Sequence, residues 1–213
     1  MTRKNKTQLT AALFMNIVIV IMETVGCILT LNRIGTETFV YYTTDSNLFS
    51  LIVSGIFAVF AAKALRNNRP DDIPQWVRVL KLMSVTCLAV TFIVVVTVLA
   101  PVHEGGYMHM LFDSDLLYYH LLCPVLSILS YIFFELHTDL KVKHSLIATI
   151  PTLLYAIVTI ILNILYIIHG PYPFLYVYEQ SLLMSCIWFI VIVGGAFIVS
   201  MPIRILGKVF SKP

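Results

Sequence analysis

Residues 181–203 read SLLMSCIWFIVIVGGAFIVSMPI and contain no charged side chain. A helix needs roughly 20 consecutive, mostly apolar residues to cross the hydrocarbon core of a membrane, and this stretch meets that requirement. Five other stretches also meet it, at residues 9–31, 43–65, 77–100, 116–136 and 146–168. The sequence therefore predicts an all-α, polytopic membrane protein, in which residues 1–213 form a single domain built as a bundle of six transmembrane helices.

The overall composition points the same way. Of the 213 residues, 59% are hydrophobic and 12% are charged, whereas soluble domains have about 45–50% apolar and about 25% charged residues. A chain with so few polar groups cannot cover a water-facing surface, so lipid is expected to be its solvent. The chain has no glycine-rich phosphate loop and no basic stripe with interleaved aromatic residues, so we expect no nucleic-acid partner.

The lysine and arginine residues predict the orientation in the membrane. All of them except Arg33 belong to the two terminal tails or to the second and fourth connections between spans. Because positively charged connections remain in the cytoplasm, we predict a cell-membrane protein with both termini cytoplasmic. The opposite face carries acidic residues and histidines as well as tyrosines. An interfacial aromatic belt needs no acids or histidines, so we expect any functional site at this outer face.

The densest polar patch lies where the second span begins, at Tyr42-Thr43-Thr44-Asp45-Ser46-Asn47. Thr43, Ser46 and Asn47 have the i, i+3, i+4 spacing that places side chains on one face of a helix. One interpretation is an N-cap, because Thr, Asp, Ser and Asn are the preferred capping residues. The other is a site that presents hydroxyl and amide groups to a ligand, and the sequence leaves both open.

The fourth span carries His120, about one turn inside its outer end. A histidine within a span is costly in lipid and usually faces the bundle or a wet cavity. It is either a structural residue bonded to a neighbouring helix or a general base. Cys123 follows three residues later on the same face, and it is either a packed thiol or a nucleophile beside His120.

Two further features are a carboxylate within the first span and a proline-containing connection before the sixth. Glu23 lies within the first span on the same face as Asn16, and it serves either helix packing or a proton relay. The outer connection before the sixth span reads His169-Gly170-Pro171-Tyr172-Pro173-Phe174, whose two prolines predict a rigid turn. The outer histidines and aspartates match no zinc-ligand spacing, so we expect no metal site and no cofactor.

Taken together, these motifs resemble the six-span membrane proteins of the androgen-induced protein superfamily, especially their small bacterial relatives. The resemblance rests on Tyr42-Thr43-x-x-Ser46-Asn47, on His120 with Pro124 one turn later, and on Pro171-Tyr172-Pro173-Phe174. The order of these motifs and their places relative to the spans also match. Eukaryotic members of that family are threonine-dependent hydrolases of fatty acid esters of hydroxy fatty acids.

The resemblance implies a membrane-embedded lipid ester hydrolase that acts on fatty-acyl esters at the outer leaflet. Thr43 would be the nucleophile, with Thr44 as the adjacent alternative, and His120 would be the base. The substrate would be a membrane lipid or a fatty-acid ester. The supporting or substrate-binding residues that we expect are Thr44, Ser46, Asn47, Cys123, Tyr172, Phe174 and Glu23.

A different class of function also fits the sequence. A small transporter or a non-catalytic lipid-binding protein would use Glu23, Asn16 and Asn163 along its path. The lack of visible inverted repeats and of paired broken helices disfavours a transporter. A purely structural role, as a subunit of a membrane complex, is the third hypothesis.

Overall fold

The computed structural model describes residues 2–69, 72–136 and 139–211, and within these ranges every regular element is a helix. Six helical stretches are long and apolar enough to cross a membrane, which confirms the predicted fold class. They span Arg3–Val40, Tyr42–Asn67, Gln75–Leu99, Ser114–Phe133, Val142–Ile164 and Leu182–Phe210.

Several spans consist of more than one helical element, because a turn of different pitch interrupts or ends the α-helix. Two of these turns are π-helical, at Val95–Leu99 and at Leu117–Leu122. In chain order the described elements are α1 (Arg3–Ile34), η1 (Gly35–Val40), α2 (Tyr42–Asn67), α3 (Gln75–Val94), η3 (Val95–Leu99), α4 (Gly106–Phe112), α5 (Ser114–Leu116), η4 (Leu117–Leu122), α6 (Cys123–Phe133), α7 (Val142–Ala148), α8 (Ile150–Ile164), η5 (Pro173–Leu175) and α9 (Leu182–Phe210).

The last two spans end at different places from those expected. α8 stops at Ile164, four residues before the predicted end, because Tyr166 has a positive φ of 57°. The side chain of Asn163 closes this end by accepting from Val177 N–H and donating to the carbonyl of Ile168. α9 continues through Pro202 to Phe210, so it extends seven residues past the predicted end.

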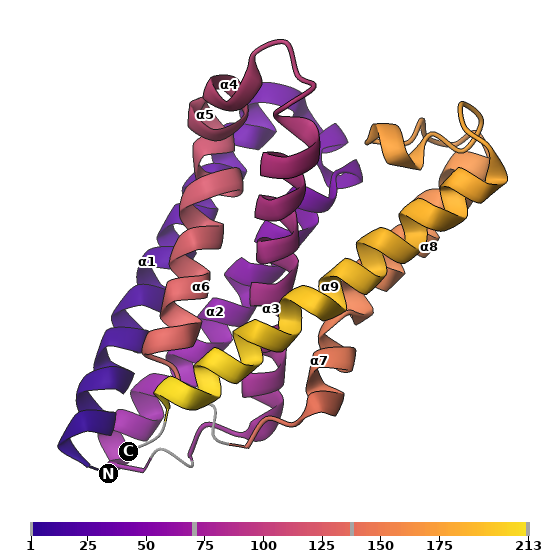
Figure 1. The fold of residues 1–213 in the computed structure, drawn as a ribbon. Coiled ribbons are helices and arrows are strands. Elements are labelled where there is room, and N and C mark those ends of the chain that lie inside the picture. The colour runs from indigo at the N-terminus through magenta and orange to yellow at the C-terminus, as the bar shows by residue number, and fades with distance from the viewer. Residues whose placement is uncertain (1, 70–71, 137–138, 212–213) are drawn as a thin grey trace.

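The four helices α1, α2, α3 and α6 form an upright bundle, and α7 with the C-terminal half of α9 packs against it (Figure 1). α8 and the first half of α9 lean away from α3 at the end of the molecule where α4 lies. Pro151 near the start of α8 separates that helix from α7 and allows the change of direction.

Both ends of the chain lie at the same end of the bundle (Figure 1). The side-chain amide of Gln8 donates to the carbonyl oxygens of Phe133 and Phe210, which joins the two terminal helices to α6. An even number of spans requires this arrangement. The assignment of that end to the cytoplasm stays a prediction from the charge distribution.

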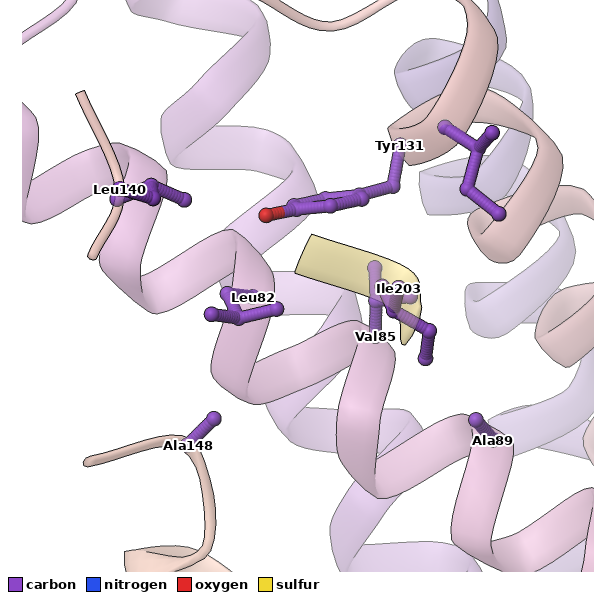
Figure 2. Packing of buried hydrophobic residues seen from close by; sticks show 8 residues of the cluster. Leu82, Val85, Ala89, Tyr131, Leu140, Ala148 and Ile203 are labelled. Carbon is purple, nitrogen blue, oxygen red and sulfur yellow. The ribbon is translucent and has the colours of Figure 1, made fainter. Parts of the chain in front are cut away.

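The bundle has an apolar core near the end that carries the termini. Figure 2 shows the ring of Tyr131 from α6 beside Leu82 and Val85 of α3, with Ile203 of α9 nearby. Polar groups lie among these apolar ones: the ammonium group of fully buried Lys81 is 2.9 Å from Asn16 Oδ1. The core therefore fixes α3, α6 and α9 at this end and leaves the opposite end freer to diverge.

Candidate active site

The polar patch at the start of α2 is buried and does not cap the helix. The N-cap residue is Tyr41, and no side chain makes a capping hydrogen bond there. Thr43, Ser46 and Asn47 are instead directed into the protein, each with at most 8% of its surface exposed. The capping interpretation is therefore wrong, and burial of so many polar groups needs another explanation.

Part of the explanation is that Ser46 and Asn47 hold the backbone of Thr43. Ser46 Oγ and Asn47 Nδ2 donate to the carbonyl oxygen of Thr43 at 3.0 and 2.7 Å. Asn47 Nδ2 also donates to the carbonyl of Tyr119, which links α2 to η4. These two side chains position Thr43 and do not present their donors to a ligand.

The neighbouring threonines differ in what their hydroxyl groups contact. Thr44 Oγ1 is 2.6 Å from Thr38 Oγ1, so that hydroxyl is engaged in a short hydrogen bond with η1. Thr43 Oγ1 has a longer contact of 3.4 Å with the hydroxyl of Tyr172, which also accepts from Thr43 N–H at 3.3 Å. Thr43 thus has the less constrained hydroxyl, and the candidate nucleophile is Thr43 and not Thr44.

Tyr172 comes from the proline-containing connection before α9. Its ring stacks on Phe174, with centroids 5.2 Å apart and an interplanar angle of 10°. Burial raises the pKa of Tyr172 to about 12 and outweighs the hydrogen bonds with Thr43, which act in the opposite direction. The phenol therefore keeps its proton at physiological pH and remains a hydrogen-bond donor beside Thr43.

His120 lies in the π-helical turn η4, immediately before α6. Pro124 has no N–H and so cannot complete the α-helical hydrogen bond to the carbonyl of His120, which is consistent with the wider turn. π-Helical turns often occur at functional sites because they redirect one side chain out of the normal helical register. Here Tyr119 and His120, although adjacent, are both buried.

The imidazole of His120 is oriented by a backbone group. Its Nδ1 lies 2.7 Å from the carbonyl oxygen of Met110 in α4. A carbonyl oxygen can only accept, so Nδ1 carries the hydrogen of the neutral ring and Nε2 retains the lone pair. This is the tautomer that a general base needs, with Nε2 as the basic atom.

Three aspartates of the chain have other surroundings than the ring of His120. Asp115 accepts from Thr30 and forms a two-pronged ion pair with Arg33, with N–O distances of 2.8 Å. Asp113 bonds to the ring of His109, and Asp45 lines a separate cavity between α2 and α8. The group that holds Nδ1 of His120 is therefore a main-chain carbonyl, which α4 supplies.

Thr43 and His120 line one cavity of about 440 Å³ near the end of the bundle that carries α4. No hydrogen bond joins the two side chains among the residues that the structure describes. The polar part of the cavity wall is formed by Thr30, Arg33, Thr38, Thr44, His103, His109 and Asp115. We refer to this space as the polar cavity.

A second space adjoins Thr43 on its other side. It is a narrow apolar groove of about 50 Å³ between α3 with η3, α8, η5 and α9. Its wall includes Val94, Val95, Ala156, Phe174, Trp188 and Ile192. We refer to it as the apolar groove. Thr43, Tyr172 and Leu99 border both spaces, so Thr43 lies where they meet.

Four of the expected supporting residues, Ser46, Asn47, Cys123 and Glu23, lie outside these spaces. Cys123 and Glu23 line neither the polar cavity nor the apolar groove, and the carboxyl of Glu23 is buried beside Ser50 and Cys123 within the bundle. Gly26 in the same helix allows the ring of Tyr119 to pack closely against α1, because a Cβ there would be 2.6 Å from that ring.

The other residues proposed for a transport path are also separated. Asn16 bonds to Glu135 and Ser130 near the terminal end of the bundle, while Asn163 closes the far end of α8. Neither asparagine borders the polar cavity or the apolar groove.

Sequence reasoning did not find the carbonyl of Met110, the Arg33–Asp115 ion pair or the apolar groove. The only local signal was Pro124, which marks an irregular turn near His120. Within residues 2–69, 72–136 and 139–211, no three His, Cys, Asp or Glu side chains are grouped as a metal site requires. Comparisons of the chain with protein-family models, with curated proteins and with solved structures find no match.

Proposed function

We propose that this protein is a membrane-embedded ester hydrolase that cleaves fatty-acyl esters, with Thr43 as the nucleophile and His120 as the general base. The observation that carries the proposal is that both side chains line the polar cavity, with the Nδ1–H of His120 held by a carbonyl so that Nε2 carries the lone pair. The motif resemblance to the androgen-induced protein superfamily, whose members use a threonine and a histidine, supports the same assignment.

In the first half-reaction, Thr43 Oγ1 attacks the carbonyl carbon of the ester while its proton passes to Nε2 of His120. The tetrahedral intermediate carries a negative oxygen. It collapses by breaking the bond to the alcohol oxygen, which takes the proton from His120. The products of this half are a free alcohol and an acyl group esterified to Thr43.

In the second half-reaction, water attacks the acyl-Thr43 carbonyl and gives its proton to Nε2 of His120. Collapse of the second tetrahedral intermediate breaks the bond to Thr43 Oγ1, which recovers the proton. The carboxylic acid leaves, and both side chains return to their starting states. The sum is one ester and one water converted to one acid and one alcohol.

Two groups near Thr43 can stabilise the negative oxygen. The protonated phenol of Tyr172 is 3.4 Å from Thr43 Oγ1. From there it can donate to the former carbonyl oxygen of the ester when that oxygen becomes negative. Thr43 also lies in the first turn of α2, where the positive end of the helix dipole favours negative charge. The arrangement matches the requirement that donors be in place before charge develops.

The test is turnover of a fatty-acyl ester by purified protein in nanodiscs. We expect Thr43→Ala and His120→Ala each to lower kcat by roughly 100-fold or more. Thr97→Ala is the matched control, because the Thr97 hydroxyl bonds only to the carbonyl of Ile93 in its own helix. Wild-type turnover by Thr43→Ala protein, or equal loss in all three variants, contradicts the proposal.

A labelling experiment tests the nucleophile independently of substrate choice. A fluorophosphonate probe reacts with activated hydroxyl groups, and we expect one labelled site, at Thr43. Thr44→Ala protein should label as wild type does, because the Thr44 hydroxyl is bonded to Thr38. Labelling that is lost in Thr44→Ala and kept in Thr43→Ala would transfer the role to Thr44.

A further inference from the structure

We infer that the apolar groove holds the acyl chain of the substrate and the polar cavity holds its alcohol, so that the preferred substrate is a single-chain ester of a small polar alcohol. This inference rests on the proposed function, because it uses Thr43 as the point of attack. It goes further by assigning each half of the ester to a place and by excluding esters with two long chains.

The first argument is the chemistry of the two walls that meet at Thr43. Aliphatic and aromatic side chains dominate the wall of the apolar groove, including Val94, Ala156 and Ile192. The polar cavity is bordered by Arg33 and Asp115, which carry charges, and by three histidines. An ester whose carbonyl carbon is at Thr43 must place one half in each space, and only one orientation matches apolar with apolar.

The second argument is size. The apolar groove has about 50 Å³ of free space and the polar cavity about 440 Å³. A narrow apolar slot admits one flexible, unbranched chain. The larger space has room for a second chain, but there that chain would lie against the Arg33–Asp115 ion pair and the rings of His103 and His109. A polar alcohol can bond to these groups, whereas an alkyl chain cannot.

The third argument is access from the membrane. α9 forms one wall of the apolar groove through Trp188 and Ile192, while Ile190 on its opposite face is 68% exposed. Figure 1 shows this half of α9 leaning away from α3. A lipid chain can therefore pass sideways from the bilayer into the apolar groove without crossing water, and the released alcohol leaves through the polar cavity.

The experiment uses glycerol monoesters of butanoic to decanoic acid with wild-type protein in nanodiscs. Burial of each added methylene in the apolar groove should raise kcat/KM roughly four-fold until the groove is full. Ile192→Trp narrows the groove and should lower kcat/KM for decanoate at least about tenfold more than it lowers kcat/KM for butanoate. Ile190→Trp, on the lipid-facing side of the same helix, is the matched control and should behave as wild type.

The melting temperature, compared with that of wild type, reports whether the Ile192→Trp protein is folded. Ala156→Leu narrows the groove from α8 by a smaller change and should give the same dependence on chain length. Equal effects of Ile192→Trp on butanoate and decanoate, or no chain-length dependence in wild type, would overturn the inference. So would faster cleavage of a decanoate ester of a long-chain hydroxy acid than of glycerol monodecanoate.

A binding experiment separates this inference from the proposed function. A decanoic acid that carries a photoreactive diazirine near its methyl end should label residues of α3, α8 or α9 that border the apolar groove. Ile192→Trp should abolish that labelling and Ile190→Trp should not. If no ester is cleaved but this labelling pattern is observed, the hydrolase proposal is wrong and the assignment of the acyl chain to the apolar groove is supported. If esters are cleaved but other residues are labelled, only the assignment of the acyl chain to the apolar groove is wrong.

Discussion

Replacing Lys81 with methionine should destabilise the protein strongly. Lys81 is fully buried in α3, and its ammonium group donates to Asn16 and Ser54 at 2.9 and 3.2 Å. It also lies 3.5 Å from Glu135, whose side chain is fully buried. Methionine keeps the length of the side chain but removes the positive charge, so the Glu135 carboxylate loses its interaction with the charge of Lys81.

The magnitude follows from that loss. Removing one partner of a buried ion pair costs about 3–5 kcal/mol, because the remaining charge stays desolvated. For a chain of this size each kcal/mol shifts the melting temperature by roughly 2–4 °C. We therefore expect Lys81→Met to melt roughly 6–20 °C below wild type, measured by thermal unfolding in detergent with intrinsic tryptophan fluorescence.

The double variant Lys81→Met, Glu135→Gln identifies the cause. Glutamine carries no charge and its carbonyl oxygen can still accept the hydrogen bonds that Asn16 and Ser130 give to Glu135. We expect the double variant to regain most of the lost stability, with a coupling energy of about 2 kcal/mol or more. Lys63→Met, at an exposed position on α2, is the control and should change the free energy of unfolding little.

The result that refutes this reasoning is additivity. If the double variant is as unstable as the two single changes combined, the two charges do not interact across the interior. A loss below about 1 kcal/mol for Lys81→Met would likewise show that water reaches the ammonium group.

Two other changes have defined outcomes. Tyr172→Phe removes the phenol beside Thr43 and should lower kcat by about 100-fold with little change in KM; because the pKa of Tyr172 is about 12, wild-type activity should show no loss from its ionisation below about pH 11. Burial opposes ionisation of Asp139, but the hydrogen bond and charge of Arg78 lower its pKa overall. A depressed carboxyl pKa gives stability that is present above the unfolded value of about 3.9 and is lost as the pH falls through the lower folded value. Asp139→Asn should therefore cost up to about 1 kcal/mol at pH 7 and nothing at pH 2 in chemical denaturation, and an equal cost at both pH values would contradict the assignment.

The helices were predictable because the signal for each span is local. Crossing the hydrocarbon core requires a continuous apolar stretch, and each stretch is visible without knowledge of any other. The ends were less predictable. α8 ends early at Ile164 because Asn163 bonds across to Val177 in the following connection, and that partner is not apparent from the apolar run itself.

The sequence pointed to the residue types of the candidate site, but it did not show which groups their side chains contact. Thr43 and His120 were singled out because polar side chains in apolar spans need a reason. Ser46 and Asn47 were expected to serve as caps or ligand donors, yet both donate to the carbonyl of Thr43. The group that orients His120 was not apparent from the sequence, and it is the main-chain carbonyl of Met110.

The sequence by itself determined that six apolar helices cross a membrane and that polar residues gather toward one face. Only the tertiary structure decided that Thr43 of α2 and His120 of η4 border one cavity, and that α8 and α9 enclose an apolar groove on the other side of Thr43. The reason is that hydrophobicity acts on each segment separately. Which faces of different helices meet depends on side-chain packing and on hydrogen bonds between residues far apart in the chain, and no local pattern records these.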